Sequence, residues 1–136
     1  MIVVDTNVVA YLFLPGDLTT AAEHVLERDA EWAVPLLWRS EFRSVLAGAV
    51  KRRLLSVGRA AEIAEAAEEQ MHGREFGVQS AEVLALASQS GCTAYDCEFV
   101  ALANDLGVAL VTNDREILAA FPDVAVPLSG SNSRTK

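Results

Sequence analysis

The chain has too few cysteines, too little proline and glycine, and too short an apolar run for several classes of protein. Cys92 and Cys97 are the only cysteines among 136 residues, too few for a disulfide scaffold or a cysteine zinc site. With 4 prolines, 8 glycines and 51% hydrophobic residues, most of the chain is expected to fold. The longest apolar run, Val8 to Leu14, has seven residues, whereas a membrane span needs about 18.

We expect no secretory signal, because the first residues carry no basic segment and Asp5 interrupts them. Together with the few cysteines, this predicts a protein of the reducing cytoplasm. The length fits one domain, which can bury about two-thirds of the surface that its unfolded chain exposes. We expect a single domain over residues 1–128 and a flexible polar tail over residues 129–136.

Positive charge is scarce, with 11 Lys and Arg against 19 Asp and Glu and a net charge of −8. This balance argues at first against nucleic acid, because binding phosphates normally needs a basic surface. The charges are unevenly placed, however. Residues 39–59 carry six basic side chains and one acid, whereas residues 61–105 carry nine acids and one Arg. Each run fits either a solvated helix face or a charged functional surface, and composition does not choose between them.

Hydrophobic periodicity and turn residues predict alternating strands and helices. Strands are expected at residues 2–4, 32–34, 75–78, 108–111 and 124–126. Helices are expected at residues 8–14, 19–28, 36–53, 56–71, 81–90, 95–106 and 115–120. This alternation predicts an α/β fold with a central, mostly parallel sheet covered by helices on both faces. Ligands of such folds bind at the carboxyl ends of the strands.

Four acids fall at or near these strand ends. Asp5 follows the first strand, Asp114 follows the strand near Leu110, Asp96 opens the helix before that strand, and Glu41 lies in the long helix after the second strand. Helix capping is an alternative explanation for three of them. Asp5 could cap the helix after it, and both Asp96 and Asp114 lie in segments with the spacing of a capping box. Capping does not explain Glu41.

Helical geometry distinguishes Asp96 from its neighbour Glu98. At about 100° per residue, Asp96 points within about 50° of the centre of its helix's apolar face, and Glu98 about 110° away from it. We therefore expect Glu98 to be a solvated acid whose replacement by Gln leaves function unchanged. Glu41 borders an apolar stripe and has small neighbours, Ser44 and Gly48, which leave space beside its carboxylate.

Carboxylates that converge on one pocket repel one another, so some must take up a proton or bind a cation. Oxygen ligands without nearby His or Cys favour a hard ion, Mg²⁺ or, as a substitute, Mn²⁺. Mg²⁺ keeps several waters and can complete its shell with phosphate oxygens of a substrate. One or two such ions would turn an acidic cleft into a phosphate-binding one, so the net charge does not exclude RNA.

The acids lie in four short motifs: Val4-Asp5-Thr6-Asn7, Arg39-Ser40-Glu41-Phe42, Tyr95-Asp96-Cys97-Glu98-Phe99-Val100-Ala101-Leu102-Ala103 and Leu110-Val111-Thr112-Asn113-Asp114. In this order and spacing the chain resembles the PIN-domain nucleases, and more narrowly the VapC-type toxins of type II toxin–antitoxin pairs. The resemblance covers nearly the whole chain. Each motif alone is weak, but the ordered set in a chain this short is specific, and the four acids show no departure from it.

The resemblance implies a Mg²⁺-dependent endoribonuclease with a three-layer α/β/α fold, a homodimer, and an antitoxin that blocks the site. It implies RNA products with 5′-phosphate and 3′-hydroxyl ends. The catalytic and metal-binding residues would be Asp5, Glu41, Asp96 and Asp114. Residues that bind substrate or support the site would be Thr6, Asn7, Thr112, Asn113, Arg39 and Arg43. Cys97 and Glu98 lie where the family varies and receive no role.

Two other functions remain open. The first is a catalytically idle PIN-like module that binds protein, which the presence of all four acids argues against. The second is a phosphatase or phosphotransfer domain with Asp5 as nucleophile. A receiver-type domain should have an acidic pair after its first strand and a late Lys, whereas Thr6 follows Asp5 and no Lys lies between Lys51 and Lys136. A dehalogenase-like phosphatase should have a second Asp at position 7, where Asn7 stands.

An antitoxin would be able to use the same acids. An Arg from the partner could occupy the place of the metal and pair with Asp5, Asp96 and Asp114, because its planar fork binds carboxylates in bidentate fashion. The stretch from Val8 to Leu14 is more apolar than one buried helix face requires. It therefore either lines a groove for such a partner or has a second buried face.

Histidine and tryptophan are assigned no chemistry. His24 and His72 lie in predicted helices without other site residues, so we expect them at the surface or at the edge of the core. Trp32 and Trp38 flank a strand and begin a helix, and core packing is expected for both rather than base stacking.

Overall fold

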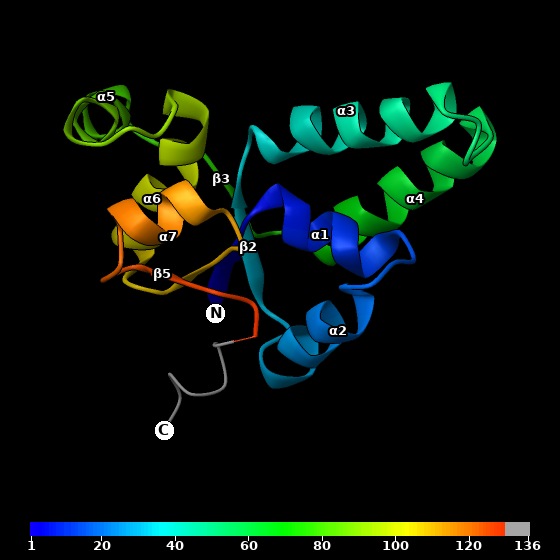
Figure 1. The fold of residues 1–136 in the computed structure, drawn as a ribbon, viewed down its shortest axis with the longest axis horizontal. Coiled ribbons are helices and arrows are strands. Elements are labelled where there is room, and N and C mark those ends of the chain that lie inside the picture. The colour runs from blue at the N-terminus through cyan, green and yellow to red at the C-terminus, as the bar shows by residue number, and fades with distance from the viewer. Residues whose placement is uncertain (130–136) are drawn as a thin grey trace.

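Five short strands form the centre of the protein, in the order β3-β2-β1-β4-β5 (Figure 1). The computed structural model describes residues 1–129. The strands are β1 (Ile2–Val4), β2 (Trp32–Pro35), β3 (Glu75–Phe76), β4 (Leu110–Val111) and β5 (Ala125–Val126). Every neighbouring pair is parallel. The α/β class is therefore confirmed, and all five described strands run in one direction.

Helices cover both faces of this sheet (Figure 1). On one side lie α1 (Thr6–Phe13), α2 (Thr19–Arg28), α3 (Trp38–Lys51) and α4 (Val57–Gln70). On the other side lie α5 (Ser80–Gln89), α6 (Ala94–Leu106) and α7 (Arg115–Ala120). The three-layer α/β/α arrangement is thus confirmed. Among residues 1–129, no helix is both long enough and apolar enough to cross a bilayer.

The predicted elements are all present, and their ends differ by a few residues. The α1 helix begins at Thr6, two residues before the predicted start, because Asp5 already occupies its N-cap position. The strand predicted from Val108 is shorter, since the Val108 N–H is bonded to the Ala103 carbonyl (3.0 Å) at the end of α6. Gly107 ends α6 as expected, with φ 66°. Residues 130–136 of the predicted tail lie outside the described residues.

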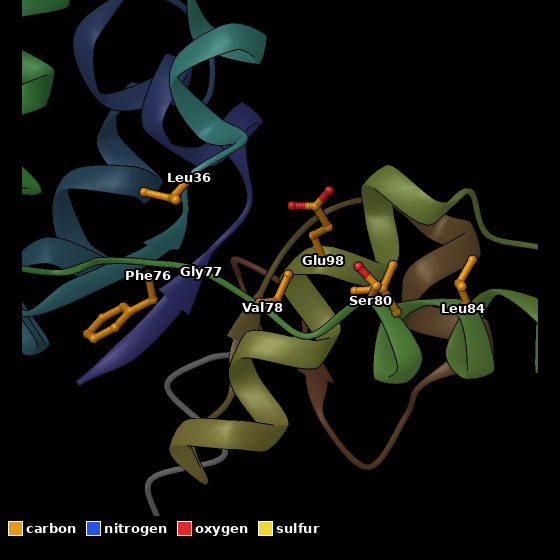
Figure 2. A pocket seen from close by; sticks show the side chains of 8 residues that line it. Leu36, Phe76, Gly77, Val78, Ser80, Leu84 and Glu98 are labelled. Carbon is orange, nitrogen blue, oxygen red and sulfur yellow. The ribbon is translucent and has the colours of Figure 1, made fainter.

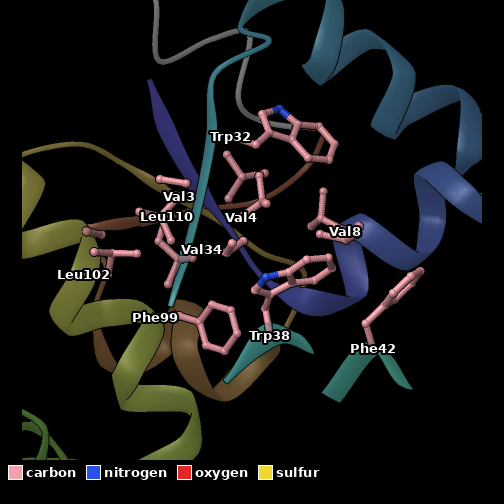
Figure 3. Packing of buried hydrophobic residues seen from close by; sticks show 14 of the residues in the cluster. Val3, Val4, Val8, Trp32, Val34, Trp38, Phe42, Phe99, Leu102 and Leu110 are labelled. Atoms are coloured by element: carbon pink, nitrogen blue, oxygen red, sulfur yellow. The ribbon is translucent and has the colours of Figure 1, made fainter. Parts of the chain in front are cut away.

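The core fills the space between the sheet and the helices on both sides (Figure 3). Trp32 and Trp38 are fully buried, which confirms packing roles for both. Trp38 stacks on Phe42, one turn further along α3, with ring centroids 5.7 Å apart. His24 and His72 are exposed, as predicted.

The apolar stretch of α1 has two buried faces. Val8 and Val9 are fully buried, and the segment from Tyr11 to Leu14 is half-buried and packs against the same core. Phe13 meets Phe42 of α3 edge to face at 6.4 Å. The apolar residues of this segment therefore pack against the core, which favours a second buried face over an open groove.

Candidate active site

An acidic cavity of about 270 Å³ opens at the carboxyl ends of β1 and β4. Its lining residues are Asp5, Thr6, Asn7, Glu41, Ser44, Val45, Asp96 and Asp114. The four acids come from four separate segments: the end of β1, the α3 helix, the first turn of α6 and the loop after β4. We call this cavity the acidic pocket. The sequence-based expectation that strand ends bring these residues together agrees with this geometry.

Thr112 connects two of the acids. Its side chain is fully buried, and its hydroxyl donates a hydrogen bond to Asp5 Oδ2 (2.7 Å). The same hydroxyl accepts one from the Asp114 backbone N–H (3.0 Å). Asp5 occupies the N-cap position of α1, but its side chain makes no capping hydrogen bond. The capping explanation for the Asp5 carboxylate is therefore wrong.

Thr6 holds Glu41 in a similar way. The Thr6 side chain is 4% exposed, and its hydroxyl donates a hydrogen bond to Glu41 Oε1 (2.7 Å). This bond joins the first residue of α1 to the first turn of α3. Asn7 is exposed and lines the pocket. Ser44, whose small size suggested space beside Glu41, lines the pocket as well.

Asp96 and Asp114 combine a place in the acidic pocket with a place at a helix end. Thr93 caps α6 by accepting a hydrogen bond from the Asp96 N–H (3.1 Å), and Asp96 lies in the first turn. Asp114 caps α7, where its Oδ1 accepts a hydrogen bond from the Ile117 N–H (3.0 Å). Capping and pocket lining are thus compatible for these two residues, and the helix ends fix where the carboxylates lie.

Burial and mutual repulsion raise the pKa of three of these acids. For Asp5, burial raises the pKa above the usual 3.8, the Thr112 hydrogen bond lowers it, and the charges of Asp96 and Asp114 raise it further. Burial also raises the pKa of Glu41, opposed by the hydrogen bond from Thr6. For Asp96, burial raises the pKa and the charge of Asp114 adds to it. The pocket therefore favours uptake of positive charge.

The donor set fits a hard divalent cation that keeps water. Among residues 1–129, no three His, Cys, Asp or Glu side chains come close enough to form a ready-made metal centre. The pocket also has no His or Cys in its lining, the ligands on which structural zinc sites depend. Mg²⁺ is typically held by one or two carboxylates plus several waters, which suits carboxylates spaced around an open cavity.

Three of the residues predicted to support the site lie elsewhere. Arg39 is bound to Glu75 through two hydrogen bonds (2.7 and 2.8 Å) and to Glu68 (3.2 Å), so its guanidinium is not directed at the acidic pocket. Arg43 lines a different cavity between α3 and α4. Asn113 accepts a hydrogen bond from the Leu128 N–H (3.0 Å), which ties down the segment after β5. The structure thus directs Arg39 to Glu75 of β3, and its predicted contact with substrate stays a prediction.

Glu98 is not the solvated acid that helical phase predicted. Glu98 is half-buried and lines a second cavity together with residues of α5. Burial raises the pKa of Glu98, and the Glu98 charge in turn raises the pKa of Glu41. Glu98 was missed because a helical wheel shows how a residue is turned within its own helix and not what packs beside it.

The chain belongs to the PIN-domain family, whose sequence model matches residues 2–125. It is 33% identical over 131 residues to the protein named Ribonuclease VapC3 from Pyrobaculum aerophilum. That alignment covers 93% of this chain and 98% of the relative. The family assignment made from the four motifs is thereby confirmed.

Solved structures share the fold. The crystal structure of PAE2754 from Pyrobaculum aerophilum superposes with a TM-score of 0.76 at 21% identity, covering 97% of this chain and 93% of that one. The FitAcB structure from Neisseria gonorrhoeae gives a TM-score of 0.70 at 20% identity, covering 93% of this chain and 96% of that one. A toxin–antitoxin complex from Klebsiella pneumoniae gives 0.64 at 20% identity, with coverages of 94% and 98%. At these identities the likeness shows the fold alone.

Replacing Thr112 tests the connection between Asp5 and Asp114. In Thr112→Val, Asp5 Oδ2 loses its donor and the Asp114 N–H loses its acceptor, in a position that water does not reach. We expect the free energy of unfolding, measured in urea, to fall by about 1–3 kcal/mol. Thr112→Ser keeps the hydroxyl and should lose less of the free energy of unfolding. Equal losses for the two variants would contradict the role of the hydroxyl.

The raised pKa values predict how stability depends on pH without metal. Because the pKa values of Asp5, Glu41 and Asp96 are raised on folding, protonation of these acids favours the folded state. This stabilisation is present when the pH is below the usual pKa values of 3.8 and 4.5, and it is lost as the pH rises through the pKa values of the folded state. In EDTA, the stability of Asp96→Asn relative to the unmodified chain should therefore increase as the pH is raised from below 3.8 to neutrality. Thermal unfolding across this range measures the difference. A constant difference would contradict the prediction.

Proposed function

We propose that the chain is a divalent-metal-dependent endoribonuclease that acts as the toxin of a toxin–antitoxin pair. The observation that carries this proposal is the acidic pocket, in which Asp5, Glu41, Asp96 and Asp114 converge from four segments of the chain. Membership of the PIN-domain family and the similarity to a protein named as a VapC ribonuclease support it. The products are expected to carry 5′-phosphate and 3′-hydroxyl ends.

Asp5 and Asp96 would hold the ion, and Glu41 and Asp114 would complete the ligand set or orient the attacking water. Mg²⁺, or Mn²⁺ in its place, would supply an activated water and neutralise charge on the phosphate oxygens. The chain's own hydroxyls keep the carboxylates in place: Thr112 positions Asp5 and Thr6 positions Glu41. The carboxylates are thus fixed before substrate binds, which avoids a reorganisation cost during the reaction.

The alternative functions fit the geometry less well. A protein-binding module without activity would have no use for carboxylates whose pKa values are raised by burial and by one another. An Asp-nucleophile phosphatase would need a second acid near Asp5 at position 7, where exposed Asn7 stands. Both alternatives predict that RNA stays intact in the presence of Mg²⁺.

Single carboxylate-to-amide changes test the nuclease. We expect Asp5→Asn and Asp96→Asn to lower cleavage of pooled RNA more than about 100-fold, since even partners of metal ligands contribute about 10–100-fold. Neither variant should melt at a lower temperature in EDTA, because Asn keeps an oxygen for the Thr112 hydroxyl and removes a repelling charge. RNA cleavage with Mg²⁺ and thermal melting are measured side by side.

A matched control is Glu116→Gln, which alters an exposed acid in the first turn of α7, two residues from Asp114. Its cleavage rate should equal that of the unmodified chain. Cleavage by Asp96→Asn within a few-fold of the unmodified chain would overturn the site assignment. A loss of several degrees in the melting temperature of Asp96→Asn would show instead that Asp96 stabilises the N-terminus of α6.

The antitoxin is proposed to lie across both α3 and the acidic pocket. Since α1 is packed inside, the open apolar surface is instead a cavity of about 360 Å³ between α3 and α4. Its lining residues are Arg43, Leu46, Ala47, Val50, Lys51, Val57, Ala60, Ala61 and Ala64. We call it the α3–α4 groove. Its apolar floor suits an amphipathic segment, and Arg43 and Lys51 suit acids beside that segment. Because Val45 of α3 lines the acidic pocket, one segment could reach both.

Calorimetry with the product of the neighbouring open reading frame, in EDTA, tests this partner. If an antitoxin Arg pairs with the acids, Asp96→Asn should bind it at least about tenfold more weakly. Ala61→Asp, in the α3–α4 groove, should also weaken binding, whereas Ala66→Asp, exposed on α4 outside the groove, should not. Equal affinities for all four proteins would contradict the neutralisation model and leave the nuclease proposal standing.

A homodimer and a cytoplasmic location complete the proposal. Cys92 and Cys97 are both free and buried, which suits a reducing compartment. Sedimentation of the purified chain decides the oligomeric state.

A further inference from the structure

A second cavity of about 370 Å³ lies next to the acidic pocket, where β2 and β3 end and α5 begins (Figure 2). Its lining residues are Leu36, Phe76, Gly77, Val78, Ser80, Val83, Leu84 and Glu98. We call it the Glu98 pocket. It shares α6 with the acidic pocket and adjoins α3. The α6 helix carries Asp96 in one and Glu98 in the other, and Leu36 lies just before α3, which carries Glu41.

Glu98 is the one ionisable side chain that lines this pocket. In Figure 2 it projects from α6 into the opening between Leu36 and Ser80. Its charge reaches Glu41, so the two pockets are close enough to interact electrostatically. Within residues 1–129 the structure shows no hydrogen bond or ion pair to its carboxylate. A half-buried carboxylate without a donor is unfavourable, and a ligand that supplies N–H groups would remove that penalty.

The walls of the Glu98 pocket favour a flat apolar body. Leu36 and Leu84 are 59% and 64% exposed, an unusual arrangement for two leucines on either side of one opening. Ser80 adds a hydroxyl, and Gly77 adds a segment without a side chain. A planar ring that is apolar on its faces and carries N–H donors on one edge matches these features. Unstacked RNA bases are recognised in this way, by packing on their faces and hydrogen bonds to their edges.

We propose that the Glu98 pocket holds one base of the RNA substrate beside the cleaved phosphodiester, with the Glu98 carboxylate accepting hydrogen bonds from the N–H groups of that base. This inference rests on the proposed ribonuclease function. Guanine is the expected base, because its ring N–H and amino group lie side by side and match the two oxygens of a carboxylate. Glu98 then determines sequence specificity, whereas the acids of the neighbouring pocket carry out cleavage.

Mapping of cleavage ends on a random RNA pool tests this role. The unmodified chain should show guanine enriched at one fixed position relative to the cleaved bond. In Glu98→Gln that enrichment should fall at least about tenfold, as expected for loss of a bidentate base contact, while cleavage at other sequences continues. Glu116→Gln, an exposed acid outside both pockets, should keep the enrichment. Unchanged base preference in Glu98→Gln would overturn the proposal and leave the nuclease standing.

A binding measurement separates this inference from the nuclease assignment. NMR titration with the four 5′-mononucleotides in EDTA should shift the Gly77 and Ser80 amides most with GMP, and Glu98→Gln should remove that effect. Such shifts would support the Glu98 pocket even if no RNA were cleaved. The same small shifts with all four nucleotides would overturn it. The proposal would also be overturned if Leu84→Asp dissociated a dimer in sedimentation without altering base preference. The exposed leucines would then belong to a subunit interface.

Discussion

The hydroxyl of Thr112 makes the two hydrogen bonds on which the arrangement of the acids depends. It lies at the end of β4 and donates to Asp5, 107 residues earlier in the chain, at the end of β1. It also accepts from the backbone at Asp114, which sets the start of α7. A single buried side chain thus fixes the spacing of two carboxylates across neighbouring strands. In a similar way, the Thr6 hydroxyl on α1 donates a hydrogen bond to Glu41 on α3 and fixes the position of that carboxylate.

Burial and charge act in the same direction in this pocket. Carboxylates that are removed from water and set near one another repel, so a bound cation lowers their free energy more than it does for carboxylates on an open surface. The acidity of the whole chain is therefore compatible with a substrate that is itself anionic. The basic side chains of residues 39–59 do not all remain available to neutralise the acidic pocket, since Arg39 already pairs with Glu68 and Glu75 from the acidic run.

The sequence was informative wherever the chemistry is local to a strand end. The β1 strand leads directly into Asp5 and β4 leads into Thr112 and Asp114, so parallel pairing was enough to bring these residues together. It was misleading where the outcome depends on a distant segment. Arg39 is neutralised by Glu75, 36 residues away on β3, and Glu98 lines a cavity together with residues of α5. Helical phase and charge counts carry no information about such neighbours, which only the packing of the layers supplies.

Asp114 shows how the fold limits the ways in which this chain can evolve. Because its carboxylate caps α7, the position tolerates few residues: Asn and Ser satisfy a helix end about as well as Asp, and most others do not. Asp5 meets a different demand, because its carboxylate accepts the hydrogen bond from the buried Thr112 hydroxyl. A lineage that abandons its chemistry is therefore expected to keep a hydrogen-bond acceptor at position 5 and a neutral cap at position 114. Descendants that keep the fold and lose the charge would then be recognisable from these two positions alone.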